Sequence, residues 1–212
     1  LWRAHMNPSL LVTAATSALV PPVLPHSPQG DDLLRRFLAD PRAGSTPWTP
    51  ALLRACLGED ADILFPEGVT QVAEACFDLM DRDMQAASGS FRSRKISRRV
   101  RAAIMFRLEH AAPYRMAIRQ ALAVLMVPTH ARILARTLGR TVNAIWQAAA
   151  DTSTGFTFLT KRVTLSGVYV STLLFWLTRG GNPASVEEFL DRRLADVGRI
   201  TRLRNRLTGR IA

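Results

Sequence analysis

The sequence predicts an all-α protein with a single large core. Hydrophobic residues make up 48% of its 212 residues, which is enough to build one substantial domain. From residue 31 onward, apolar side chains recur at steps of three and four residues, the spacing of amphipathic helices. No segment shows the strict apolar and polar alternation of a half-buried strand that would compete with this interpretation. We therefore expect one helical bundle.

Capping residues and prolines divide this region into helices. Thr49 is an N-cap residue followed by Pro50 at the first helical position, and Ser185 with Glu188 has the pattern of a capping box. Pro41 and Gly44 are expected to end the first helix. The expected helices cover residues 31–39, 50 onward, 60–64, 69–86, 93–109, 113–127, 129–149, 156–178 and 185–207.

The longest apolar helix lacks charge entirely between residues 163 and 177. Its apolar side chains cover nearly the whole circumference, including Leu165, Tyr169, Leu173 and Trp176. Such a helix is buried in a large core, against a second subunit, against a lipid ligand, or in a membrane. A membrane span is disfavoured because it needs about 20 apolar residues, whereas Arg162 and Arg179 bound this shorter run.

Three separated blocks carry a resemblance to a known family. They are AADTSTGFTFLTKRVTLSGVYVSTLLFWL with the following FLDRRLADV, the earlier LFPEG at 64–68, and KISRRVRAAIMFRLE at 95–109. In order and rough spacing these blocks resemble the Coq-nine family of ubiquinone-biosynthesis accessory proteins. The resemblance covers residues 31–199, which we expect to form the folded domain. It implies a TetR-like bundle of about nine to ten helices, with the last two long helices forming a homodimer interface.

The resemblance also implies ligands, partners and a location. It implies an isoprenoid quinone or other lipid bound inside the bundle and a ubiquinone-pathway hydroxylase as partner. It implies peripheral attachment to a membrane surface, either the cytoplasmic side of a bacterial inner membrane or the matrix side of the mitochondrial inner membrane. We expect the cavity to be lined from three successive helices by Leu122, Leu125, Met126, Val142, Trp146, Leu165 and Tyr169. Residues of these types at such positions are more often plain core than ligand lining.

The partner surface is expected at the start of the apolar helix. The family has an aspartate and a tryptophan-tyrosine pair after the DTST corner, where this chain has Gly155, Phe158 and Leu159. These positions remain apolar but lack the tyrosine hydroxyl and the tryptophan indole of the family. This implies that the partner-binding surface has changed or that the partner is a different protein. Arg162 matches a basic residue of the family, as a partner contact or as a support for the corner.

The net charge of +11 predicts attraction to an anionic partner. One basic cluster starts the expected helix at 93–109 and contains Arg92, Arg94, Lys95, Arg98, Arg99 and Arg101. It is interpreted either as a solvated face or as a contact for anionic headgroups or an acidic protein partner. The second cluster lies in the expected basic tail at 200–212. The residues expected to bind the membrane are Arg199, just before this tail, and Ile200, Leu203, Arg204 and Leu207 within it. The alternative interpretation is a fraying tail.

The order of the expected helices, short ones followed by long ones, also raises the possibility of a DNA-binding function. Short helices followed by long ones are typical of TetR-type regulators, whose third helix enters the major groove. The corresponding stretch, residues 58–68, contains four acidic residues and neither lysine nor arginine, so it would repel phosphate. We therefore expect no nucleic-acid partner. A TetR-type ligand-responsive transcription regulator remains the alternative, and a helical adaptor that binds only protein is the third possibility.

Catalytic and metal-binding patterns are missing from the sequence. The four histidines lack metal-ligand spacing, and no nucleophile elbow or phosphate-binding loop occurs. Asp78, Asp81 and Asp83 are interpreted as a solvated acidic face, and Cys56 and Cys76 as inert core thiols. We expect neither catalytic residue, metal nor cofactor, so the protein is not predicted to be an enzyme. Residues 1–30, with five prolines, are predicted to form a disordered arm.

Overall fold

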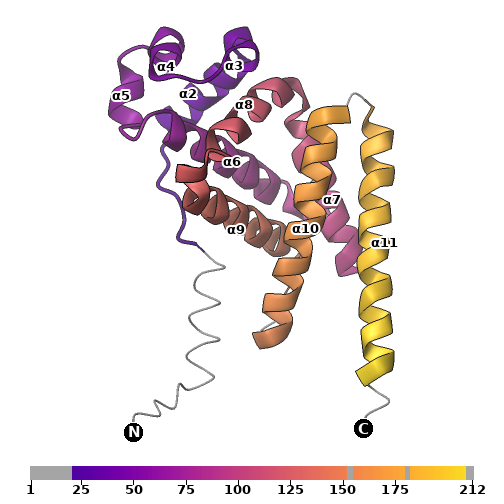
Figure 1. Cartoon of the computed structure of the whole chain (residues 1–212). Helices are drawn as coiled ribbons and strands as arrows, with labels where there is room; N and C mark the ends of the chain where they lie inside the picture. Colours follow the sequence, from indigo (N-terminus) through magenta and orange to yellow (C-terminus); the bar gives the residue numbers. More distant parts are fainter. Residues whose placement is uncertain (1–20, 152–154, 180–181, 209–212) are drawn as a thin grey trace, which may run out of the picture.

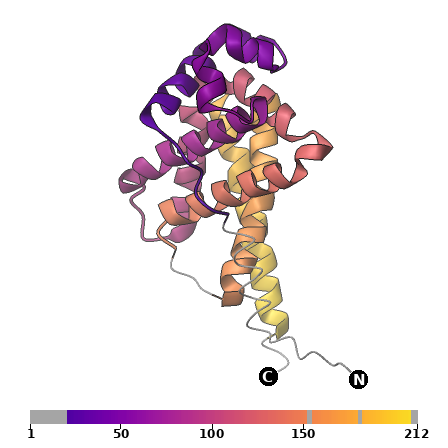
Figure 2. The same ribbon diagram turned by 90° about the vertical axis from the view of Figure 1, so that its left-hand side faces the viewer.

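The computed structural model describes residues 21–151, 155–179 and 182–208, and the side chains outside 155–159 and 200–208. Every regular element in the described part is a helix, which confirms the all-α prediction and fits a TetR-like bundle (Figure 1). Four short helices gather at one end of the molecule. The start of the apolar helix and the end of the last helix lie at the other end (Figure 2).

The four short helices are α2 (Pro28–Ala39), α3 (Pro41–Ser45), α4 (Pro50–Leu57) and α5 (Asp60–Leu64). Helix α2 begins three residues before the expected residue 31, because the Ser27 hydroxyl accepts a hydrogen bond from the Gly30 amide at 3.1 Å. The boundary expected at residue 30 therefore lies inside this helix. Thr49 caps α4 as predicted, and its Oγ1 accepts from the Leu52 amide at 3.2 Å.

Helix α2 ends at Ala39 as predicted, but Pro41 and Gly44 then form part of a further short helix, α3, which was not predicted. Here Asp40 acts as the N-cap, its Oδ1 accepting from the Arg42 amide at 2.8 Å, and Pro41 occupies the first turn. Helix α3 packs against α8, and Gly44 permits the close approach. A Cβ atom at Gly44 would lie 3.0 Å from the Cβ of Met116.

Helix α6 (Val69–Ala86) has the predicted bounds and forms the centre of the bundle, packed against α7, α8 and α9. Helix α7 runs over Ile96–His110, α8 over Arg115–Leu125 and α9 over Ala131–Ala148. The helices expected at 113–127 and 129–149 are one or two residues longer at each end than the observed α8 and α9. Short 3₁₀ turns, Ala112–Tyr114 and Pro128–His130, instead occupy the residues just before them.

The last two helices are α10 (Gly155–Arg179) and α11 (Pro183–Thr208), which pack against each other. The predicted capping box at Ser185 is wrong: Asn182 Oδ1 accepts from the Ala184 amide at 3.0 Å, so the helix begins earlier. Helix α11 also contacts α7 along one edge of the bundle (Figure 1). It continues past residue 200 to Thr208, close to the expected end at residue 207, so the expected basic tail at 200–212 begins within this helix.

Among the described residues, no single helix is long and apolar enough to span a membrane. Helices α8 and α9, each with its preceding 3₁₀ turn, are long and apolar enough for a span only when they are joined. The two are bent by 87° relative to each other.

Candidate functional site

An apolar pocket of about 270 Å³ lies between α6, α8, α9 and α10. Its lining comes from all four helices and from Met126 just after α8, so the packing of the bundle itself creates the cavity. The residues that line it are Phe77, Leu122, Leu125, Met126, Leu134, Thr137, Leu138, Thr141, Tyr169, Val170, Leu173 and Leu174. Ligand pockets are commonly apolar with few polar groups, and this lining has that composition.

Four of the seven residues expected in a lipid site line this pocket: Leu122, Leu125, Met126 and Tyr169. The other three, Val142, Trp146 and Leu165, are buried in the core but do not belong to its lining. Sequence reasoning missed Leu134 and Leu138 on α9. Their four-residue spacing before Val142 indicated an inward-facing stripe of α9, but not which of its residues line the pocket.

The threonine hydroxyls of the pocket are already engaged. Thr137 Oγ1 donates to the Ile133 carbonyl at 2.9 Å, and Thr141 Oγ1 donates to Asp81 Oδ2 at 2.8 Å. Both donors are therefore committed within the protein. Their methyl groups and the surrounding leucines leave the pocket wall apolar.

A buried ionic network lies behind the pocket. Arg107 is fully buried, and its Nε donates to Asp81 Oδ1 at 2.7 Å while its Nη1 donates to the Tyr169 hydroxyl at 2.6 Å. Its Nη2 donates to the Phe77 carbonyl at 3.2 Å. Phe77 and Tyr169 are also pocket residues, so the network fixes two of its walls.

The expectation of a solvated acidic face on α6 is therefore wrong. Asp81 is buried against Arg107, and the nearly buried Asp78 accepts from Arg82 Nε at 2.9 Å. Only Asp83 stays near the surface, where it pairs with Arg35 at 2.6 Å. The acidic residues serve as internal partners, and the described residues contain no His, Cys, Asp or Glu group able to hold a metal ion.

Burial controls the titration of this network. It raises the pKa of Asp81, while the Arg107 charge and the Thr141 hydroxyl act in the opposite direction. Desolvation acts to lower the pKa of Arg107, but the Asp81 charge and Tyr169 outweigh it and the net shift is upward. Burial also raises the pKa of Tyr169 to about 12, so its hydroxyl stays protonated at neutral pH.

The pocket opens on an apolar stretch of surface. Met126 is 60% exposed and Leu174 is 44% exposed, although both line the pocket. Val127, next to Met126, is also exposed. Large apolar side chains at the mouth of an apolar cavity are unfavourable in water unless something covers them.

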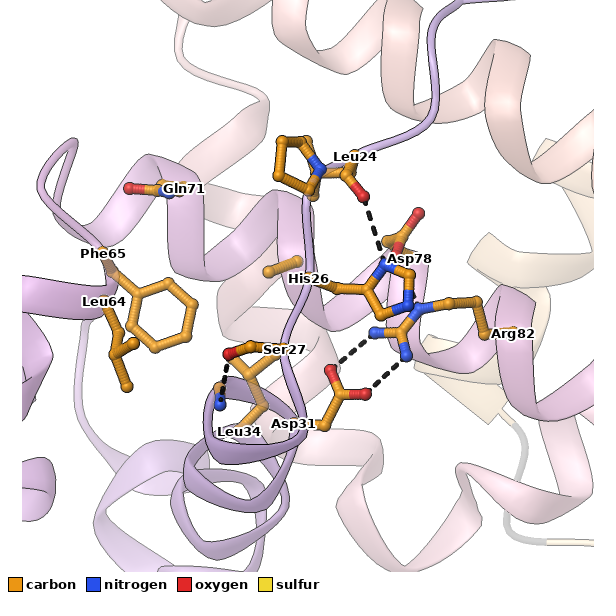
Figure 3. A pocket seen from close by; sticks show the side chains of 13 residues that line it. Leu24, His26, Ser27, Asp31, Leu34, Leu64, Phe65, Gln71, Asp78 and Arg82 are labelled. Atoms are coloured by element: carbon orange, nitrogen blue, oxygen red, sulfur yellow. Dashed lines mark hydrogen bonds and ion pairs between the residues drawn. The ribbon is translucent and has the colours of Figure 1, made fainter.

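A second cavity of about 240 Å³ lies beneath the extended segment that precedes α2 (Figure 3). Arg82 lies beside Asp31 on one side of it, its Nη1 and Nη2 donating to the two oxygens of Asp31 at 2.5 and 2.7 Å (Figure 3). Phe65 and Leu34 line the opposite side. Because an ion pair is part of its lining, this cavity suits an apolar ligand less well than the first.

The corner before α10 is held by buried polar contacts. Lys161 Nζ lies 2.7 Å from Asp151 Oδ1, and Arg162 Nη2 donates to Asn143 Oδ1 at 2.9 Å. Arg162 is only 6% exposed, which fits the support for the corner, one of its two expected functions. Phe158 and Leu159 lie on α10, but their side chains are outside the described residues, as are residues 152–154 of the DTST corner.

The basic cluster at the start of α7 divides into two groups. Arg99 donates to the carbonyls of Ala149 and Ser93 at 2.6 and 2.5 Å, and Arg101 pairs with Glu187 and Asp191 of α11. These two side chains join elements of the fold. The exposed remainder comprises Arg92, Arg94, Lys95 and Arg98, which we call the α7 basic group.

The second basic cluster belongs to the end of α11. Arg199 is exposed and lies 3.9 Å from Asp196. Ile200, Leu203, Arg204 and Leu207 follow on the same helix, with side chains outside the described residues. The predicted membrane-binding stripe therefore falls on a continuous helix.

At the position of a DNA-reading helix, α5 presents an acidic surface. Its Asp62 pairs with Arg54 of α4 at 2.8 Å, and Ile63 is 76% exposed. Neither feature suits a helix that has to approach phosphates, which require cationic or hydrogen-bond-donating side chains.

The fold and the site define a TetR-like helical bundle with an internal apolar pocket. Residues 131–201, which contain α9, α10 and most of α11, match the COQ9 family model. The chain is similar to the ubiquinone biosynthesis protein COQ9, mitochondrial, of Bos taurus, with 27% identity over 142 residues. It is 28% identical to the corresponding protein of Rattus norvegicus over the same length. The resemblance to the Coq-nine family is thereby confirmed.

These alignments cover 66% of this chain but only 44% and 45% of the two relatives. The chain thus matches less than half of the length of these mitochondrial proteins.

Proposed function

We propose that this chain is a non-catalytic accessory protein of ubiquinone biosynthesis that binds an isoprenoid quinone intermediate in the pocket between α6, α8, α9 and α10. The observation that carries the proposal is the pocket itself, an apolar cavity whose threonine donors are committed elsewhere. Its relatives are named ubiquinone biosynthesis proteins, which supplies the pathway.

The size of the pocket suits part of a long lipid. Its volume of about 270 Å³ is near the lower end, roughly 300 Å³, of ligand pockets. A polyprenyl tail would therefore fill the cavity and continue past Met126 and Leu174 at the mouth. Removing apolar surface from water contributes about 25 cal/mol per Å², which lowers the cost of withdrawing such a molecule from a membrane.

The ligand would be presented at the corner before α10. In this proposal a hydroxylase contacts Phe158 and Leu159, while Arg162 supports the corner from within by its bond to Asn143. The α7 basic group and the end of α11 would hold the protein at an anionic membrane surface. The mitochondrial names of the relatives support a mitochondrial location, and a place on the matrix side of the inner membrane belongs to this proposal.

A homodimer is part of the same proposal. Val163, Gly167 and Leu174 follow one another along α10 at helical spacing and are all exposed, with Val170 half-buried between them. A second copy packed on this stripe would remove apolar surface from water beside the mouth of the pocket. The acidic α5 speaks against the alternative of a transcription regulator.

The test is mass spectrometry of organic extracts from the purified protein, compared with a variant whose pocket is filled. Leu138→Trp places a larger side chain into the lining, whereas Ile63→Trp changes an exposed residue on the distant α5. We expect a polyprenylated quinone or precursor in stoichiometric amount from the wild type and from Ile63→Trp, and a strong loss from Leu138→Trp.

Three outcomes would overturn the proposal. Extracts that are empty for all three proteins would favour an adaptor that binds only protein. Equal lipid in Leu138→Trp would place the ligand elsewhere. A gel shift that persists on specific DNA at moderate salt would revive the regulator.

A further inference from the structure

We propose that a second copy of this chain closes the mouth of the apolar pocket, with Val163 of that copy lying against Leu174. The second copy then extends the pocket wall, so that lipid binding and dimerisation strengthen each other. Both the lipid and the homodimer belong to the proposed function, on which this inference rests. The register of the two copies and the coupling between the two equilibria go beyond it.

Two residues belong both to the pocket wall and to the exposed side of α10. Val170 and Leu174 line the pocket, and Leu174 is also 44% exposed while Val170 is half-buried. Tyr169 and Leu173, the other lining residues of α10, are buried. Val170 and Leu174 therefore form the outer edge of the cavity, and a surface that packs on them also borders its mouth.

The exposed side of α10 has a spacing that is the same when it is read in either direction. Its residues follow at steps of four, three and four positions, and we call them the α10 stripe: Val163, Gly167, Val170 and Leu174. A two-fold interface brings the same patch of both copies together, so a contact between two different residues occurs twice. When two such stripes pack antiparallel, Val163 of each copy lies opposite Leu174 of the other. Gly167 then lies opposite Val170, and the contact covers about 16 Å of each helix.

Gly167 allows the close approach that this pairing needs. Within the described part of the chain, no atom of another element lies within 4 Å of the position that a Cβ of Gly167 would occupy. A glycine in a helix interior is destabilising relative to alanine, and the packing of one copy does not require it here. Gly44 differs, because α8 approaches it within the same chain. Opposite Val170 of a second copy, the missing side chain of Gly167 leaves room for the valine.

The charge of the protein favours a second copy as the occupant of the α10 stripe. The chain carries a net charge of +11, so two copies repel each other through their charged surfaces. Residues 163–177 contain no charged side chain, and two copies therefore meet here with the least repulsion. An anionic membrane or a charged protein would find no countercharge on the stripe, whereas a second copy presents a matching apolar one.

The shared edge of pocket and stripe couples the two equilibria. An apolar tail that leaves the pocket past Leu174 meets water in a single copy, but it meets Val163 of the second copy in the dimer. The apolar surface removed from water at this point stabilises the dimer only when ligand is bound. By linkage, the dimer must then bind the ligand more tightly by the same factor.

The first experiment measures this coupling in the full chain. Sedimentation velocity over a range of protein concentrations gives the dissociation constant of the dimer, with and without saturating decyl-1,4-benzoquinone as the probe. We expect the probe to lower this constant by about fivefold or more, the usual range of coupling between two sites. An unchanged or raised constant, or a wild type that is monomeric throughout, overturns the inference. Failure of the probe to bind at any protein concentration overturns the proposed function instead.

A variant on the stripe but outside the pocket separates the two events. Val163 is 58% exposed and is not a lining residue, so Val163→Glu should fold, remain monomeric and bind the probe more weakly by the same factor. Ile63→Glu is the matched control, because it places the same charge at an exposed apolar residue on the distant α5. It should keep both dimerisation and the wild-type affinity. A monomeric Val163→Glu that binds the probe as tightly as the wild-type dimer contradicts the coupling.

Cysteine pairing tests the antiparallel register. Val163→Cys and Leu174→Cys are prepared separately in a Cys56→Ser background, because Cys56 is a partly exposed native thiol. Under mild oxidation, an equal mixture of the two should form disulfide-linked dimers, and either variant alone should form few, because a disulfide needs Cβ atoms about 4 Å apart. Cross-linking of each variant with itself in preference to the other would indicate a parallel arrangement and would overturn the inference.

Discussion

The Nε atom of Arg107 lies 2.7 Å from Oδ1 of Asp81, and both side chains are closed off from solvent between α6 and α7. Removing one member of such a pair leaves an uncompensated charge in the core. We expect Asp81→Asn to lower the free energy of unfolding by about 3–5 kcal/mol, measured by urea denaturation.

The exposed pair of Asp83 with Arg35 supplies the matched comparison on the same helix. Asp83→Asn should cost less than about 1 kcal/mol, because solvent screens a surface ion pair. Equal effects of the two substitutions would contradict the assignment of Asp81 as the structurally important acid of α6.

The acidic residues of α6 show where sequence reasoning fails. Their spacing at 78, 81 and 83 resembles a solvated face, and the residues that neutralise them lie far away in sequence, Arg107 being 26 positions from Asp81. A signal was nevertheless available, since α6 carries apolar residues on nearly every side. A charge on a helix buried all round must be paired.

Helix positions were more predictable than the site, because caps and prolines act locally. Thr49 and Pro50 fixed the start of α4, whereas Asn182 took the capping function expected of Ser185. The pocket depends on how helices are rotated against one another. Periodicity alone therefore could not show that Leu138 faces the cavity while Val142, one turn later, packs in the core.

Tyr169 should make stability depend on pH at the alkaline end. Its pKa is raised from 10.0 to about 12 by burial, so the folded state holds the proton more tightly than the unfolded state. The resulting stabilisation is complete below pH 10 and is lost as the pH rises through about 12. This difference in pKa between the unfolded and folded states contributes at most roughly 2–3 kcal/mol to the free energy of unfolding.

The measurement is urea denaturation of the wild type and Tyr169→Phe between pH 9 and about 12. Phenylalanine cannot ionise, so subtracting its curve removes the contribution of all other titrating groups. We expect the difference between the two proteins to shrink toward high pH. A difference that stays constant would mean that Tyr169 titrates normally.

Ala150 ends α9 in a conformation that favours glycine, with φ at 52°. The Asp151 amide donates to the Trp146 carbonyl at 3.1 Å and the Ala150 amide to the Gln147 carbonyl at 2.8 Å, the two bonds of a Schellman motif. We expect Ala150→Gly to raise the free energy of unfolding by up to about 1 kcal/mol, because it relieves the left-handed strain. Ala149→Gly, at a right-handed position, should instead be destabilising. Thermal melting curves of both variants and the wild type test this expectation. A loss of stability in Ala150→Gly would contradict the presence of backbone strain at Ala150.

The α7 basic group should bind anionic membranes, whereas the neighbouring Arg99 in the first turn of α7 should stabilise the fold. Replacing Arg92, Arg94, Lys95 and Arg98 together by alanine removes four exposed charges, each contributing on the order of 1 kcal/mol near an acidic surface. We expect sedimentation with phosphatidylserine vesicles at low salt to weaken by two orders of magnitude or more, with stability nearly unchanged. Arg99→Ala should behave in the opposite way, because it frees the carbonyls of Ala149 and Ser93 while removing little exposed charge. If the quadruple variant kept its vesicle binding, the membrane contact would have to come from the end of α11 alone.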